Sequence, residues 1–206
     1  LTLPDKEIIP FTGIDIYRPT NIWYAEEIYE ITKGKFPNVN IANLEVFKFD
    51  VRDPKMLIKA KERWREDINP PFGGYIKNFH MTTNIRKLVE KHKPTFETNG
   101  LTANPPIEDQ IKYGFQHISE KRRNVSNANP IVYKKGRVSY KPFINVDKRF
   151  IADLYRQHNL MNDIFPITQS CTGYENTTDY WTKPCKSCFW CHEKKWAFGC
   201  YDGGVC

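Results

Sequence analysis

Six cysteines, all between Cys171 and Cys206, are the residues of this chain whose types and spacing indicate chemistry. Three of them form the run C-x2-C-x2-C (Cys185, Cys188 and Cys191), and Cys171 can supply a fourth thiolate from a preceding loop. Short spacings of this kind let the sulfurs surround a metal ion tetrahedrally, with backbone amides wrapped around the sulfurs. Four thiolates leave no open position, so the sequence predicts a structural zinc site that adds folding energy and does no chemistry.

An iron–sulfur cluster is the main alternative to zinc, because C-x2-C-x2-C ligation also occurs in ferredoxins. His192 could replace a cysteine as ligand, but its place beside Cys191 favours a bystander. Cys200 and Cys206 are spare, and Cys200 is the reserve ligand if Cys171 lies too far away. The aromatic residues of this region are expected to cover the metal site as a small core: Trp181, Phe189, Trp190, Trp196 and Phe198.

The composition of the chain limits the class of protein. Its 206 residues and 40% hydrophobic content predict a globular protein of ordinary domain size. No apolar run is long enough for a membrane helix, and the start lacks the pattern of a signal peptide, so we expect a cytoplasmic protein. Cysteines crowded into one short stretch also favour a metal site in a reducing compartment over a set of disulfides.

The formal net charge of +7 fits a polyanionic partner such as ATP, RNA or DNA. The basic residues are dispersed, however, and their tightest cluster is Lys121-Arg122-Arg123. A nucleic-acid partner is therefore open but not favoured, no membrane partner is expected, and a homodimer stays open.

Alternating strands and helices must position these residues. We predict strands at 7–16, 43–51, 95–100 and 139–144, and helices starting at about 21, 53, 75, 107 and 147, with an irregular polar segment at 124–137. This alternation predicts an α/β fold, a mainly parallel sheet with helices on both faces. The predicted domains are an α/β domain over 1–165 and a cysteine-rich zinc-binding segment over 166–206. Ligands bind such folds at the carboxyl ends of strands, which here are followed by the turns at Asp15 and at Asn99-Gly100.

Residues 142–191 carry a more specific pattern, in which PFINVDK (142–148) and ITQSC (167–171) precede the run C-x2-C-x2-C. This pattern resembles the C-terminal part of the 7-cyano-7-deazaguanine synthases and their relatives among the PP-loop ATP pyrophosphatases, an adenine nucleotide alpha-hydrolase-like fold. In that family the four cysteines hold a structural zinc. Upstream the resemblance is weak: residues 11–15 would be the second strand of the nucleotide-binding sheet, and residues 97–104 the turn near the nucleotide.

The sequence departs from the family in two ways. The Ser-Gly-Gly-x-Asp-Ser loop that cradles pyrophosphate in the family does not occur in these 206 residues. In the family it lies just upstream of where this chain begins, so either that segment precedes this sequence or ATP is not held in the usual way. The gap between Cys171 and Cys185 is also longer than in the synthases, which puts the substrate in doubt.

The resemblance implies an ATP-dependent ligase, or ATP pyrophosphatase, that uses Mg2+ and acts on a small purine-like heterocycle. Such an enzyme adenylates a carboxylate or amide, releases pyrophosphate and lets an amine displace AMP. Lys148 is the expected catalytic lysine that faces the phosphates, with a solvated helix residue as the alternative. Asp15 could touch ribose or a metal, and Asn99 and Gly100 could bring backbone close to adenine; plain turn roles are the alternatives.

Two other functions stay open at this point. A sulfur-transfer enzyme or sulfonucleotide reductase of the same fold would be favoured by an iron–sulfur cluster in place of zinc. A non-catalytic, zinc-bearing nucleic-acid-binding protein would be favoured by binding that weakens steeply with salt.

Overall fold

The computed structural model describes residues 6–18, 20–50, 52–55, 58–59, 73–115, 131–132, 138–173, 175–180 and 182–206. The chain forms two compact units, Leu1–Lys93 (unit 1) and Pro94–Cys206 (unit 2). The domain boundary expected between residues 165 and 166 lies inside unit 2. The basic cluster 121–123, Trp181 and most of the helix predicted from residue 53 lie outside the described residues, as does most of the segment 124–137.

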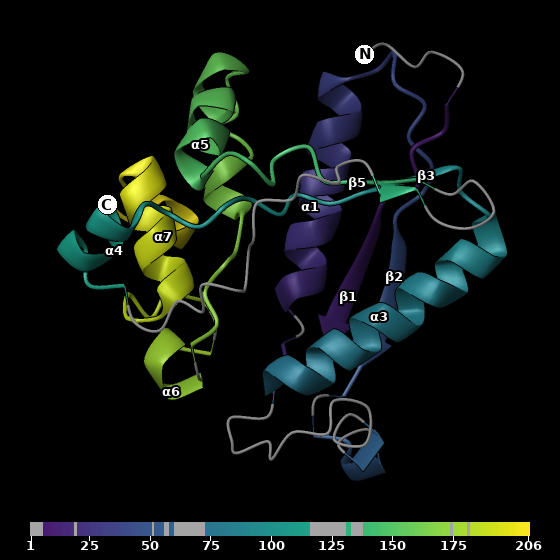
Figure 1. Cartoon of the computed structure of the whole chain (residues 1–206), viewed down its shortest axis with the longest axis horizontal. Helices are drawn as coiled ribbons and strands as arrows, with labels where there is room; N and C mark the ends of the chain where they lie inside the picture. The colour runs from purple at the N-terminus through teal and green to yellow at the C-terminus, as the bar shows by residue number, and fades with distance from the viewer. Residues whose placement is uncertain are drawn as a thin grey trace. The chain divides into compact units, whose positions relative to one another are not determined.

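Unit 1 is built around two parallel strands, as the alternation of strands and helices predicts. Strand β1 (Phe11–Asp15) pairs with β2 (Glu45–Phe49) in parallel, and helix α1 (Thr20–Lys35) connects them. Helix α3 (Gly73–His92) packs against β2 (Figure 1). The carboxyl ends of both strands lie at the same edge, because Asp15 is in register with Phe49.

A glycine in β1 allows the aromatic packing of this small sheet. A Cβ atom at Gly13 would lie 2.5 Å from the Phe47 ring and 2.9 Å from the Met81 sulfur of α3. Phe47 therefore packs across β1 at a position where any side chain would collide with it. Among the described residues of unit 1, Ile14 and Phe49 are the buried apolar ones, and α1 contributes none.

Unit 2 contains a three-stranded sheet and several short helices. Strand β5 (Val138–Tyr140) lies between β3 (Phe96–Thr98), to which it is parallel, and β4 (Ile131–Val132), to which it is antiparallel. The described residues of this unit form helices α4 (Ile107–Lys112), α5 (Lys148–Gln157), α6 (Glu175–Thr178) and α7 (Phe189–Phe198), with 3-10 turns η1 (Phe165–Ile167) and η2 (Asp202–Gly204). Asp147 caps α5 by accepting a 2.8 Å hydrogen bond from the Arg149 amide, which agrees with the predicted helix start.

The core of unit 2 lies where α5 packs against α7 (Figure 1). Ala152 of α5 is fully buried and lets α7 approach closely. The Phe165 and Phe198 rings stack with centroids 4.7 Å apart, and Trp196 and Ala197 complete the buried cluster. Trp196 and Phe198 thus belong to the main core of the unit, whereas Phe189 and Trp190 are half-buried at the start of α7.

The prediction of a mixed helix-and-strand fold with parallel strands is confirmed, but one large sheet is not what the described residues form. They form two small sheets, of two and three strands, and the second contains an antiparallel pair. Helix α7 was not predicted, because cysteines and aromatic residues obscure its apolar periodicity. Within the described part of the chain, none of the helices combines the length and apolarity needed to cross a membrane.

Candidate metal centre

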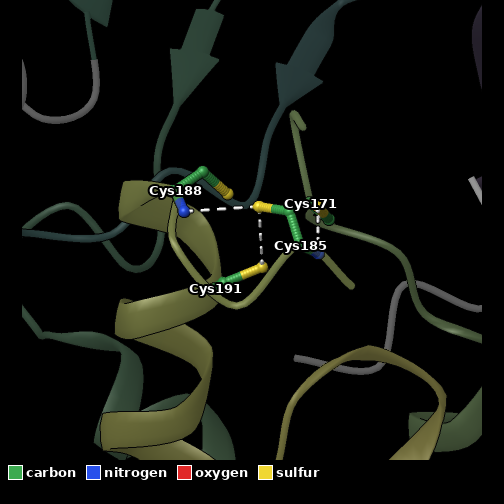
Figure 2. A group of neighbouring side chains, drawn as sticks. All are labelled: Cys171, Cys185, Cys188 and Cys191. Atoms are coloured by element: carbon green, nitrogen blue, oxygen red, sulfur yellow. Dashed lines mark hydrogen bonds between the residues drawn. The ribbon is translucent and has the colours of Figure 1, made fainter. Parts of the chain in front are cut away.

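Four cysteine sulfurs meet at the start of α7. The Sγ atoms of Cys171, Cys185, Cys188 and Cys191 all lie within 4.8 Å of one another. Figure 2 shows these side chains turned toward a common point. Cys188 is the N-cap of α7 and Cys191 lies in its first turn, while Cys171 and Cys185 come from the two loops before it. The structure thus brings together all four predicted ligands, in a group that could hold a metal ion.

Backbone amides point at the sulfurs, as the short spacings predict. The Gly173 and Cys185 amides each donate to Cys171 Sγ at 3.3 Å, and the Cys188 amide donates to Cys185 Sγ at 3.3 Å. Amide donors stabilise thiolates, the form in which cysteine binds a metal. The partial positive charge at the N-terminus of α7 acts in the same direction on Cys188 and Cys191.

The thiols titrate as a group when no metal is bound. A hydrogen bond from Cys171 lowers the pKa of Cys188, and the same bond raises the pKa of Cys171 to about 11. Hydrogen bonding with Cys171 and Cys188 raises the pKa of Cys191, a side chain that is almost fully buried. Shared protons therefore link these sulfurs, and a metal ion can bind the sulfurs only by displacing those protons.

Gly173 makes the approach of the two ligand loops possible. A Cβ atom at this position would lie 2.6 Å from the Cys185 Cβ, 2.7 Å from the Thr178 methyl group and 3.0 Å from the Cys185 sulfur. Two of these contacts are too short for any side chain, so the site requires glycine between Cys171 and α6.

A buried carboxylate holds the backbone of the first ligand. Asp202 Oδ2 accepts hydrogen bonds from the Ser170 amide at 2.9 Å and the Cys171 amide at 2.7 Å. Asp202 Oδ1 accepts from the Ser170 hydroxyl at 3.0 Å and from the Lys194 amine. The Lys194 amine also donates to the Thr168 carbonyl at 2.8 Å. Sequence reasoning missed this network, because an aspartate after a helix gives no signal of a partner some thirty residues upstream.

Burial shapes the charge of this network. Asp202 and Lys194 are each 4% exposed, so they form a paired charge inside the unit. Burial lowers the pKa of Lys194, although the Asp202 carboxylate opposes that change. The pair is stable there only because Ser170, Cys171 and Thr168 satisfy the remaining hydrogen-bonding capacity.

Lys148, the predicted catalytic lysine, is the first residue of α5. Its amine lies 2.7 Å from Glu193 Oε2, and the Glu193 side chain is fully buried on α7. The amine also lies 5.8 Å from the centroid of the Trp190 ring. Lys148 therefore neutralises a buried carboxylate two residues after Cys191, and one fifth of its side chain remains exposed.

The predicted nucleotide-binding residues occupy the ends of strands. Asp15 ends β1 in unit 1, is 8% exposed, and accepts a hydrogen bond from the Tyr17 amide at 3.1 Å. Asn99 and Gly100 follow β3 in unit 2 and are exposed, and Asn99 Oδ1 accepts from the Leu101 amide at 3.1 Å. Both Asp15 and Asn99 thus make local turn contacts, the alternative role stated for them.

The remaining cysteines are joined to each other. Cys200 and Cys206 form a disulfide, so Cys200 is not a reserve ligand. Cys171 is close enough to the other three sulfurs to complete the set without it. His192 is not in the sulfur cluster, as expected, and its ring lies 6.2 Å from that of Phe115.

No protein-family model matches the chain, and neither the curated proteins nor the solved structures contain a significant match.

Proposed function

We propose that the four cysteines hold one zinc ion as a structural site. The observation that supports this most directly is the spacing of the sulfurs. With Zn–S bonds of about 2.3 Å, tetrahedral geometry separates the sulfurs by about 3.8 Å. Cys185 Sγ and Cys191 Sγ are 3.9 Å apart, and all four sulfurs lie within 4.8 Å of one another. A cluster of four irons spreads its thiolates over different irons and therefore needs a wider set, which favours a single ion.

Metal analysis of the purified full chain tests this proposal, with visible absorbance taken on the same sample. We expect one zinc per chain and no colour, whereas iron with brown absorbance would contradict a zinc site. Gly173→Ala supplies a sharper test, because the new methyl group must displace Cys185. Zinc affinity should fall roughly tenfold or more. Gly100→Ala is the matched control, since no atom lies within 4 Å of a Cβ placed there.

We further propose that the zinc site supports an ATP-dependent adenylating enzyme resembling the 7-cyano-7-deazaguanine synthases. The proposal rests on the resemblance over residues 142–191, and two structural features are consistent with it. The four cysteines of the motif converge, and β1 and β2 are parallel strands joined by a helix, an arrangement in which ligands bind at the carboxyl edge. In this enzyme ATP activates a carboxylate of a purine-like heterocycle, Mg2+ neutralises the phosphates, and ammonia displaces AMP.

Formation of AMP and pyrophosphate from ATP tests the enzymatic proposal, with zinc-loaded chain, Mg2+, ammonia and a deazapurine carboxylate. We expect AMP only when the heterocycle is present. Lys148→Met should reduce the rate of AMP formation, and Lys183→Met, which removes an exposed lysine paired with Asp179, should not. Absence of ATP binding and of AMP formation in protein with a full complement of zinc would contradict the enzymatic proposal and leave the metal site standing.

A further inference from the structure

The Cys200–Cys206 disulfide closes a short ring directly after α7. Gly199 ends the helix with a φ of 81°, and the chain then turns so that Cys206 returns to Cys200. Inside the ring the Tyr201 amide donates to the Val205 carbonyl at 2.8 Å. The disulfide and this hydrogen bond together fix the turn η2, which carries Asp202.

Asp202 links this ring to the metal centre. The ring holds the carboxylate whose Oδ2 accepts the Ser170 and Cys171 amide hydrogen bonds, and Cys171 is one of the four sulfur ligands. The turns η1 and η2 pack against each other, which places the ring against the segment that leads to Ser170. A change in the ring is therefore transmitted through Asp202 to the backbone of a metal ligand.

The two sulfurs of the disulfide differ in access. Cys206 is exposed at the end of the ring, while Cys200 is half-buried and packs against the core around Phe198. An attacking thiolate therefore reaches the Cys206 sulfur first.

We propose that Cys200 and Cys206 form a thiol–disulfide exchange site whose reduction loosens the metal centre. The co-reactant is a dithiol. One of its thiolates attacks Cys206 Sγ, forms a mixed disulfide and releases the Cys200 thiolate. The second thiolate of the reagent then attacks the reagent sulfur that is bonded to Cys206, which closes the reagent into a ring and releases the Cys206 thiolate. Two electrons and two protons pass from the dithiol to the protein, and the reagent becomes a cyclic disulfide.

Reduction opens the ring, so residues 203–206 are no longer tied to the end of α7. Asp202 then keeps its own hydrogen bonds and the Tyr201–Val205 hydrogen bond but loses the covalent restraint of the ring, so its hydrogen bond to the Cys171 amide weakens. Groups that hydrogen-bond metal ligands typically change metal affinity by about 10–100-fold when they are removed. Reduction leaves the carboxylate in the protein, so the lower end of this range, about tenfold faster metal release, is the expected effect.

The experiment uses the full chain loaded with zinc, and in this respect the inference rests on the proposed metal site. One half of the sample is treated with dithiothreitol, which is removed by gel filtration, and the other half stays oxidised. Intact mass confirms the gain of two hydrogens in the reduced half. Zinc transfer to a chromogenic chelator should be about tenfold faster from the reduced protein. Equal transfer rates, or an oxidised preparation in which Cys200 and Cys206 are free thiols, would overturn the proposal.

Two variants separate the steps of this coupling. The double variant Cys200→Ser with Cys206→Ser should release zinc at the fast rate with or without prior dithiol treatment. Asp202→Asn keeps the disulfide, so it should release zinc faster in both redox states and lose most of the difference between them. If the double variant does not fold, the comparison of oxidised and reduced wild-type protein still decides the matter.

Zinc content before the chelator is added reports separately on the proposed function. A chain without bound metal would contradict the metal site itself. The coupling would then be judged by hydrogen exchange of the Ser170 and Cys171 amides, which Asp202 protects. Faster exchange after reduction would support the exchange site, and unchanged exchange would refute it.

Discussion

Unit 1 and the C-terminal region of unit 2 (residues 144–206) are stabilised in different ways. In the described part of unit 1, two apolar residues, Ile14 and Phe49, and one charged residue, Asp15, are buried. The C-terminal region buries many more, and they include a charged pair and one cysteine of the sulfur cluster: Ile144, Ala152, Ile164, Phe165, Thr178, Cys191, Glu193, Lys194, Trp196, Ala197, Phe198 and Asp202.

The two regions therefore differ in the kind of interaction that stabilises them. The described residues of unit 1 depend on one pair of parallel strands and on the packing of Phe47 and Met81 against Gly13. The C-terminal region combines an aromatic core with cross-links that do not need a large apolar area, namely a disulfide, paired charges and a sulfur cluster. Cross-links of this kind compensate for the small core that a short segment can build.

Loss of the metal should produce the largest difference between the two regions. A structural zinc contributes about 10–16 kcal/mol of apparent folding free energy in small zinc-binding peptides. Cys188→Ser should therefore expose the amides of residues 144–206 to hydrogen exchange and leave unit 1 protected. Gln157→Ala, at an exposed position at the end of α5, is the control. Full protection of α7 in metal-free protein would show that the aromatic core suffices without the ion.

Truncation of the aromatic core should come next. Phe165 is 2% exposed and stacks on Phe198, so Phe165→Ala should lower the free energy of unfolding by about 3–5 kcal/mol. Phe150→Ala removes a ring that is 45% exposed on α5, and its cost should be clearly smaller. Urea denaturation of the zinc-loaded protein measures both values. Equal effects of the two substitutions would mean that the core is not centred on Phe165.

A pair of glycine substitutions tests the packing of unit 1. In Gly13→Ala the new methyl group pushes the Phe47 ring and the Met81 side chain away from β1, which should destabilise this unit by about 1–3 kcal/mol. Gly34→Ala, in α1, meets no atom within 4 Å and should stabilise it by about 0.5–1 kcal/mol. The melting temperature of each variant, together with hydrogen exchange of the β1 and β2 amides in the folded protein, distinguishes the effects of the two substitutions. A neutral Gly13→Ala would contradict the close approach of Phe47 to β1.

The smallest effect is expected for an exposed ion pair of unit 1. Glu45 lies 2.7 Å from the Lys91 amine, and this hydrogen bond, together with one from His92, lowers the pKa of Glu45. A lowered pKa gives stability that is complete above the ordinary value of 4.5 and is lost as the pH falls through the folded-state value.

Because the groups are partly solvated, the Glu45 pair should contribute less than about 1 kcal/mol. Glu45→Gln should remove part of the acid-dependent loss of stability in unit 1, measured by denaturation between neutral and acidic pH. Glu90→Gln, at an exposed position of α3, serves as the control. An identical pH profile for the Glu45→Gln variant and the wild type would exclude this pair as a source of stability.

Much of the local structure follows from the sequence. Strands β1, β2, β3 and β5 and the helices α1, α3 and α5 all overlap predicted segments, and Asp147 is the predicted cap of α5, because apolar periodicity and capping residues are local signals. The extent of the sheets does not follow, since pairing between distant strands depends on contacts that periodicity does not encode.

The sequence by itself determined which four cysteines come together. Three cysteines at C-x2-C spacing must lie close to one another, and the fourth follows from residue type, so type and spacing suffice to predict a candidate metal site. The tertiary structure alone decided the partners of the charged and spare residues. Cys200 pairs with Cys206, Lys148 with Glu193, and Asp202 with Lys194 and the Cys171 amide.

These partners could not be predicted, because a charged side chain at a helix start or after a helix end is compatible with solvent as well as with burial. Only the packing of α5 on α7 and of η1 on η2 removes water from Glu193 and Asp202. Once water is excluded, an unpaired charge is strongly unfavourable, so each of these two carboxylates lies beside a lysine that the fold brings to it.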